Sequence, residues 1–270
     1  MPSPSTSTRH PLPPPTEWIP FSQSVSLMFK TKRLLGYSVV LFAVTIALTW
    51  FGYMVITGYA DAFISGYFSN PPVAEGLWGW IKHTGWVTGK WFLLLISRIF
   101  AFYLSFLFSY SLTTPGYVLL SSATEKVQLG EHFASDDGFS LRGALVDLIE
   151  GIKIGLYGVL VTFAALLVSF IPVVGQVVVF LLYSFYSALM FIDYPASRRR
   201  WTLRRKIGWI SANRGIAFRL GFVPAVLSMV PFLNIFLLAI FFPMLTIHAT
   251  LNFTNSQPDN DGTRRESYGH

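Results

Sequence analysis

Of the 270 residues of this chain, 53% are hydrophobic and only 12% are charged, against about 25% in soluble domains, so most of the chain belongs in lipid. The net charge is +7, but the basic residues flank apolar segments, which indicates signals for membrane orientation and argues against nucleic acid as a partner. The lack of cysteine excludes disulfides, iron–sulfur clusters and thiol chemistry.

Both ends of the chain are polar. Residues 1–20 are rich in proline, serine and threonine and have no apolar core, so we expect a disordered tail without a cleavable signal. Residues 254–270 form a second polar stretch, for which we also expect disorder. The intervening residues, 21–253, are predicted to form a single α-helical membrane domain.

The first apolar segment covers residues 34–56, which is long enough to cross a bilayer. Lys30, Lys32 and Arg33 precede it, and basic residues stay on the cytoplasmic side, so we expect a cytoplasmic N-terminus. A long loop should then lie on the opposite face. Four tryptophans in and after this loop fit an aromatic belt at the membrane interface: Trp78, Trp80, Trp86 and Trp91.

A second span is predicted over residues 87–112, and it contains Arg98 within an otherwise apolar run. A charge at that depth is costly. Arg98 should therefore face protein, water or a bound anion, or its side chain should snorkel to the headgroups. We count Arg98 among the possible pathway residues.

Pro115 and Gly116 predict a break in the chain after the second span. Residues 117–129 are expected to form a separate helix beyond it. From Leu141 the apolar residues recur with helical spacing and lead into a longer apolar stretch. Three glycines in this stretch lie close to one helical face, which is typical of close helix packing in membranes: Gly151, Gly155 and Gly158.

Two later segments share one design, in which a proline is followed by two apolar residues and then by Gly or Asn. Pro172 precedes Gly175, and Pro231 precedes Asn234. Because proline cannot continue the preceding helix, the chain should turn at both sites. Residues 221–230 form an arm of only about 15 Å, half of a ~30 Å hydrocarbon core. We predict two re-entrant helical hairpins, the alternative being ordinary spans joined by short turns.

Polar groups beside these breaks are candidates for an ion path. Gln176 and Asn234 stand at the starts of the second arms, where each could line the path or hydrogen-bond the broken backbone. His248 lies in a mostly apolar stretch and could either carry protons or be a packed, neutral histidine.

The strongest basic cluster follows Phe191 and is expected on the cytoplasmic side, with the C-terminus. It could serve only to orient the chain, or it could also hold lipid headgroups or collect anions at a pore mouth. Asp193, just before it, could pair with Arg198 or Arg214 and hold the cytoplasmic ends together. The cluster consists of Arg198, Arg199, Arg200, Arg204, Arg205 and Lys206.

The chain also carries a series of short motifs in order. The most specific is Asp193-Tyr194-Pro195 followed by Arg198-Arg199. The others are Pro115 with Glu125-Lys126-Val127, Ile171-Pro172-Val173-Val174-Gly175, Val230-Pro231 with Asn234, and His248-Ala249-Thr250. Together they resemble the CysZ sulfate permease family, in the group that includes the etoposide-induced membrane proteins, and the chain looks like a divergent member.

The resemblance implies two long transmembrane helices, two partly penetrating hairpins, assembly into homo-oligomers, and sulfate uptake across the inner membrane for cysteine synthesis. The family's sulfate site resembles a Gly-Leu-Arg-Arg element at the start of the first span. Here that stretch reads Thr31-Lys32-Arg33-Leu34, in which Arg33 matches by position and Lys32 adds charge. An oxyanion suits the N–H groups at a helix start together with a guanidinium, so Lys32 and Arg33 are the predicted anion-binding residues, the alternative being that they only orient the first span in the membrane.

The sequence therefore predicts an inner-membrane permease or channel for a small inorganic oxyanion, with sulfate as the first candidate. The alternative is a non-transporting membrane scaffold of the same fold. No enzyme motif is recognised, and neither a cofactor nor a metal site is predicted.

Overall fold

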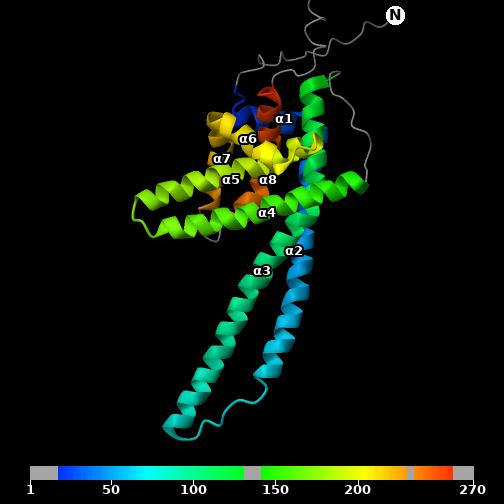
Figure 1. Cartoon of the computed structure of the whole chain (residues 1–270). Helices are drawn as coiled ribbons and strands as arrows, with labels where there is room; N and C mark the ends of the chain where they lie inside the picture. The colour runs from blue at the N-terminus through cyan, green and yellow to red at the C-terminus, as the bar shows by residue number, and fades with distance from the viewer. Residues whose placement is uncertain (1–17, 131–140, 230–233, 258–270) are drawn as a thin grey trace, which may run out of the picture. The chain divides into compact units, whose positions relative to one another are not determined.

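The computed structural model describes residues 18–130, 141–229 and 234–257, and the regular structure in this part of the chain is all α-helix or short helical turns, without strands (Figure 1). Within α4 and α8, side chains are described from residues 149 and 237 onward. Within these ranges five helices are long and apolar enough to cross a membrane: α2, α3, α4, α5 and α8. The predicted all-α, multi-pass membrane architecture is confirmed. The helices are α1 (Phe21–Lys30), α2 (Lys32–Tyr67), α3 (Gly76–Leu129), α4 (Leu141–Ser169), α5 (Val174–Arg198), α6 (Leu203–Ala212), α7 (Arg214–Ser228) and α8 (Asn234–Asn255).

The chain divides into two compact units, and the first, residues 39–116, is a hairpin made of most of α2 and the first part of α3. Apart from Leu41 and Ile64, its buried positions are small, and all but Ala101 of these are hydroxyl residues, whereas many of its exposed positions are large and apolar. Ser105 is 1% exposed and donates to the Ala101 carbonyl at 2.6 Å, while Phe51 and Phe63 are 67% and 77% exposed. Close packing on small residues with internally satisfied hydroxyls is the pattern of helices that meet in lipid.

Helix α3 continues through Pro115, so the predicted break at Pro115 and Gly116 is wrong. A proline removes one helical hydrogen bond, but membrane helices tolerate this where hydroxyl side chains help to satisfy the backbone. The carbonyl left without its helical donor is that of Ser111, and the neighbouring Tyr110 carbonyl accepts the Thr114 hydroxyl at 3.0 Å. Gly116 serves packing instead, because a Cβ atom there would overlap with the side chain of Leu41.

The second unit contains the described residues up to Ser38 and from Tyr117 onward. Helix α5 is at its centre and packs against α4, α6, α7 and α8, while α1 packs against α8. In Figure 1, α4 and α5 lie side by side as an antiparallel pair.

A very close helix approach in this unit joins α5 and α7. Ala217, Gly221 and Ala225 recur every fourth residue of α7 and are all buried. A Cβ atom at Gly221 would overlap with the carbonyl oxygen of Ser184 in α5, so only glycine permits this contact. The glycines predicted to pack on α4 behave differently: only Gly158 meets a neighbour, the hydroxyl of Tyr186, and the other two face open space.

A sharp turn around Pro172 joins α4 to α5. Val173 has φ 63° and ψ −63°, and the Val174 N–H donates to the Pro172 carbonyl at 2.7 Å, which makes a strained three-residue γ-turn. Gly175 then lies so close to α4 that a Cβ atom would overlap with the Val168 carbonyl oxygen. The helix therefore breaks at Pro172, and Gly175 lets the two arms meet.

The lengths of the paired helices differ in a way that bears on the predicted hairpins. Helices α4 and α5 have 29 and 25 residues, about 43 and 37 Å, and either is long enough to cross a ~30 Å core. Helix α7 has 15 residues, about 22 Å, and is too short to cross alone. Pro231, between α7 and α8, lies outside the described residues, so the re-entrant character of this hairpin stays a prediction.

Candidate anion-binding sites

Lys32 and Arg33 occupy the first turn of α2. The chain enters this helix through Thr31, whose extended backbone (φ −101°, ψ 98°) separates α1 from α2 and whose carbonyl accepts the Leu35 N–H at 3.1 Å. The N–H groups just after Thr31 have no acceptor within the helix. Both cations are exposed, and no ion pair joins either to an acid within the described ranges. This turn therefore has the chemistry of an oxyanion site.

The basic cluster at the end of α5 and the start of α6 contains both buried and exposed members. Arg198 and Arg199 both reach the carboxylate of Glu125, at 3.3 and 2.6 Å, and the Glu125 side chain is only 1% exposed. These two arginines tie α5 to the end of α3. The members that are exposed to solvent are Arg200, Arg204 and Arg205.

Lys206 is the most deeply buried member of the cluster. Its side chain is 0% exposed, and its ammonium donates to Asp193 Oδ1 at 2.5 Å. The same oxygen accepts the Ser197 hydroxyl at 3.0 Å. The predicted pairing of Asp193 with Arg198 or Arg214 is therefore wrong. Five residues along α5 place Arg198 about 140° around the helix from Asp193, and the cation comes instead from α6.

Glu150 connects α4 to α6. Its carboxylate accepts the Lys153 ammonium at 2.6 Å and the Leu203 N–H at 2.8 Å. Leu203 is the first residue of α6, so this carboxylate satisfies a free N–H at the positive end of that helix. Three acids thus hold the charged ends of the second unit together.

His248 packs α1 against α8. Its side chain is buried, and Nδ1 lies 2.9 Å from the Ser24 hydroxyl and 3.2 Å from the Asn252 amide. The rings of Trp18 and Phe21 stand edge-on to it, with centroids 5.1 and 5.4 Å away. These contacts enclose the imidazole on several sides and give it a structural role.

The two polar residues predicted beside the helix breaks differ in what the structure describes. Gln176 is exposed in the first turn of α5, four residues after Pro172. Asn234 is the first residue of α8, and its side chain lies outside the described part. Each therefore occupies a helix start, as the sequence predicts.

Arg98 pairs with an acid from the other helix of the first unit. Its Nη2 donates to Asp61 Oδ2 at 2.9 Å, and the two side chains are 39% and 41% exposed. The guanidinium of Arg98 therefore faces an acidic side chain of the protein, as expected for a charge within an apolar run.

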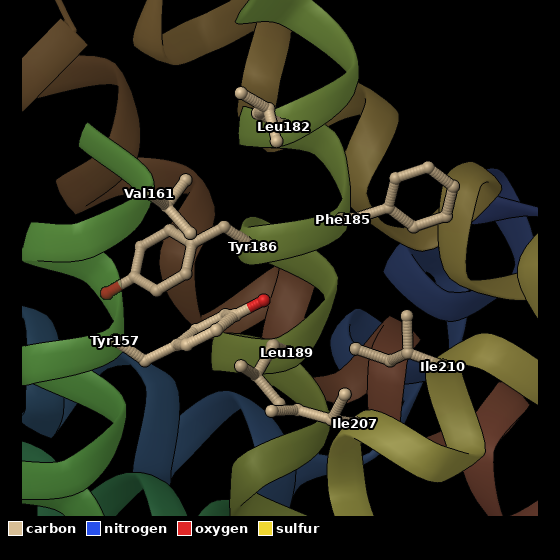
Figure 2. A pocket seen from close by; sticks show the side chains of 8 residues that line it. All are labelled: Tyr157, Val161, Leu182, Phe185, Tyr186, Leu189, Ile207 and Ile210. Carbon is tan, nitrogen blue, oxygen red and sulfur yellow. The ribbon is translucent and has the colours of Figure 1, made fainter. Parts of the chain in front are cut away.

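The apolar cavity between α4, α5 and α6 has no charged lining. Figure 2 shows its eight side chains, with the rings of Tyr157 and Tyr186 on neighbouring helices. Their centroids are 6.5 Å apart, and the cavity volume is only about 70 Å³. A desolvated anion would find no cation here, so the cavity is a packing space and not an ion site.

The comparison with protein families decides the assignment. The family described as "Sulfate transporter CysZ/Etoposide-induced protein 2.4" matches residues 20–239. The chain belongs to this family. No curated protein matches it.

In this member of the CysZ/etoposide-induced protein family, sequence reasoning missed the acids that organise the charges. Asp61 is the one acid in the 36 residues of α2, and that isolation in an apolar helix was a usable signal. Glu125 and Glu150 gave no comparable signal, because Glu125 pairs with Arg199, 74 positions away, and Glu150, besides its neighbour Lys153, accepts the Leu203 N–H from 53 positions away.

Proposed function

We propose that this family member is an inner-membrane permease for a small inorganic oxyanion, with sulfate as the first candidate substrate. The observation that carries the proposal is the first turn of α2, where Lys32 and Arg33 stand exposed, without an acidic partner in the described ranges, at the positive end of a 36-residue helix. The membership in a family described as sulfate transporters supports the choice of anion.

The distribution of paired and free cations supports this site over the larger basic cluster. Arg198, Arg199 and Lys206 already bind carboxylates, so an anion would have to compete with them. The exposed members Arg200, Arg204 and Arg205 lie at or just before the start of α6, where the Glu150 carboxylate already accepts the Leu203 N–H and would repel an anion. At Lys32 and Arg33 the guanidinium, the ammonium and the first N–H groups of α2 can all donate to one oxyanion.

The proposed path continues along the second hairpin, because α7 is too short to cross and its turn would leave polar backbone inside the membrane. Gln176 and Asn234 are the polar residues that we assign to the path. His248 is assigned to packing because of its enclosing contacts. The chain would work as a homo-oligomer in the inner membrane, with both termini in the cytoplasm.

Uptake of labelled sulfate into liposomes tests the proposal. Flux should saturate with sulfate and should fall at least about tenfold in Arg33→Gln, since one charge-assisted hydrogen bond contributes a factor of this size. Lys30→Gln is the matched control, because Lys30 is exposed two residues before the site and loses the same charge. Flux without saturation, or equal losses in both variants, would leave the scaffold alternative as the better description.

A further inference from the structure

A polar cleft lies between α2 and α3 near the loop that joins them, inside the unit of residues 39–116. Its volume is about 530 Å³, within the range of small-molecule sites. Helix α2 contributes Asp61 and Ser65, one turn apart. Helix α3 contributes a stripe that includes Trp86, Lys90, Trp91 and Arg98. One acid and two basic side chains thus share one cleft.

The charged residues at the ends of the apolar parts of these helices indicate how deep in the membrane the cleft lies. Residues 34–60 of α2 and residues 99–124 of α3 carry no charge. These runs measure about 40 and 39 Å, and even at a tilt of 40° about 30 Å remains along the membrane normal. That length fills a whole hydrocarbon core. Asp61 and Arg98 stand at the loop-side ends of these uncharged runs, so we place their charged groups at headgroup level.

The charged groups of the cleft have unused hydrogen-bonding capacity. One N–H of Arg98 donates to Asp61, although a guanidinium has five donors and a carboxylate about four acceptor sites. Asp61 Oδ1 has no hydrogen-bond partner among the described residues and is shielded from solvent, whereas Oδ2 meets Arg98. Lys90 lies 5.5 Å from the centroid of the Trp86 ring, and no acid pairs with its ammonium in the described part of the chain.

The existing ion pair is easily opened. Both of its side chains are more than one-third exposed, and such pairs shift an equilibrium only by a factor of about five or less. Rotation of the Asp61 carboxylate about its terminal torsion, which is broad, also exchanges its two oxygens. A ligand that satisfies Asp61 and Arg98 separately can therefore displace their mutual contact.

We propose that this cleft binds a phospholipid whose head group joins a phosphate to a primary ammonium, as in phosphatidylethanolamine. The phosphate, an acceptor only, suits Lys90 and Arg98. The ammonium carries N–H donors and suits the free capacity of Asp61. Trp86 and Trp91 belong at this level, since indole rings favour the interface and their faces attract cations.

Other ligands satisfy only part of the cleft. A free oxyanion would meet the two cations but also the repulsion of Asp61. Phosphatidylglycerol offers hydroxyls in place of the ammonium, and phosphatidylcholine keeps the positive charge but has no N–H donor. The three lipids therefore separate the contribution of charge from that of hydrogen bonding.

Native mass spectrometry of the full chain in detergent, with equal amounts of the three lipids, tests the proposal. Occupancy by phosphatidylethanolamine should exceed that by either other lipid by about fivefold. Asp61→Asn should bring the three lipids within about twofold of one another, while Lys90→Gln should lower the binding of all three. Lys82→Gln is the matched control, because Lys82 lies over Trp78 at 5.7 Å but does not line the cleft.

Three outcomes would overturn the proposal. One is equal binding of the three lipids by the unchanged protein, and another is a preference that survives in Asp61→Asn. The third is release of bound phosphatidylethanolamine by inorganic phosphate at millimolar concentration, which would make the cleft a free-oxyanion site. The measurement counts bound lipid and not flux, so its result is independent of the proposed transport activity.

Discussion

Lys206→Met removes a cation that lies wholly inside the protein. The Lys206 ammonium donates to Asp193 at 2.5 Å and lies 3.4 Å from the Ser197 hydroxyl. Without it, the Asp193 carboxylate, whose side chain is 15% exposed, loses its cation in a site with little water. Breaking a buried pair from one side costs about 3–5 kcal/mol. Because Asp193 keeps some contact with solvent, we expect a loss near the lower end, about 3 kcal/mol.

Two further variants make this prediction specific. Asp193→Leu combined with Lys206→Met removes both charges, and a buried pair can often be replaced by apolar residues without loss. The double variant should therefore be more stable than Lys206→Met alone. Arg204→Gln is the matched control on the same helix, since Arg204 is exposed and its loss should change the free energy of unfolding by less than about 0.5 kcal/mol.

The assay is unfolding of the purified protein in mixed micelles as the fraction of sodium dodecyl sulfate increases, followed by circular dichroism. The reasoning would be refuted if Lys206→Met unfolded at the same point as Arg204→Gln. It would also be refuted if the double variant were no more stable than the single one. In either case Lys206 would belong with the exposed cations and not with the contacts that hold α6 to α5.

Two other substitutions probe the same unit by the same unfolding measurement. Gly221→Ala should cost about 1–3 kcal/mol, because the added methyl group overlaps with a backbone carbonyl of α5 that cannot move aside; an unchanged midpoint would contradict this contact. Glu125→Gln should cost about 3 kcal/mol, because two arginines lose their shared, buried carboxylate, whereas Lys126→Gln, at the next and exposed position, should have little effect.

Hydropathy was enough to predict the helical membrane fold, because a long apolar run in lipid has few alternatives to a helix. It failed at Pro115, where the rule that proline ends a helix is drawn from proteins in water. In α3 the surrounding helix and its hydroxyl-rich turn keep the chain wound through that residue. Local sequence patterns therefore predicted which segments are helical better than they predicted where each helix ends.

The pairing of charges could not be predicted in the same way. In the sequence, the basic residues of the run Arg198–Lys206 look alike. In the structure, Arg198 pairs with Glu125 and Lys206 pairs with Asp193. Which member turns inward depends on how α3, α5 and α6 pack, and that information is not local. Small residues show the same limit: they recur at similar spacing on α4 (Gly151, Gly155, Gly158) and α7 (Ala217, Gly221, Ala225), but among the described glycines of these two helices only Gly221 meets a backbone.

The depth of the second hairpin decides between a path and a plain bundle, and the chain allows a direct test because it has no cysteine. Helix α7 reaches about 22 Å from Arg214 at its start, so a re-entrant turn would stop about 8 Å short of the far side of a ~30 Å core. Met229→Cys, at the exposed end of α7, should then resist a membrane-impermeant maleimide added to the outside of intact cells. Tyr67→Cys, at the end of α2, is the positive control. Equal labelling at both positions would mean that the second hairpin reaches the outer surface, and the polar backbone at its turn would then be satisfied by water and not available to a passing anion.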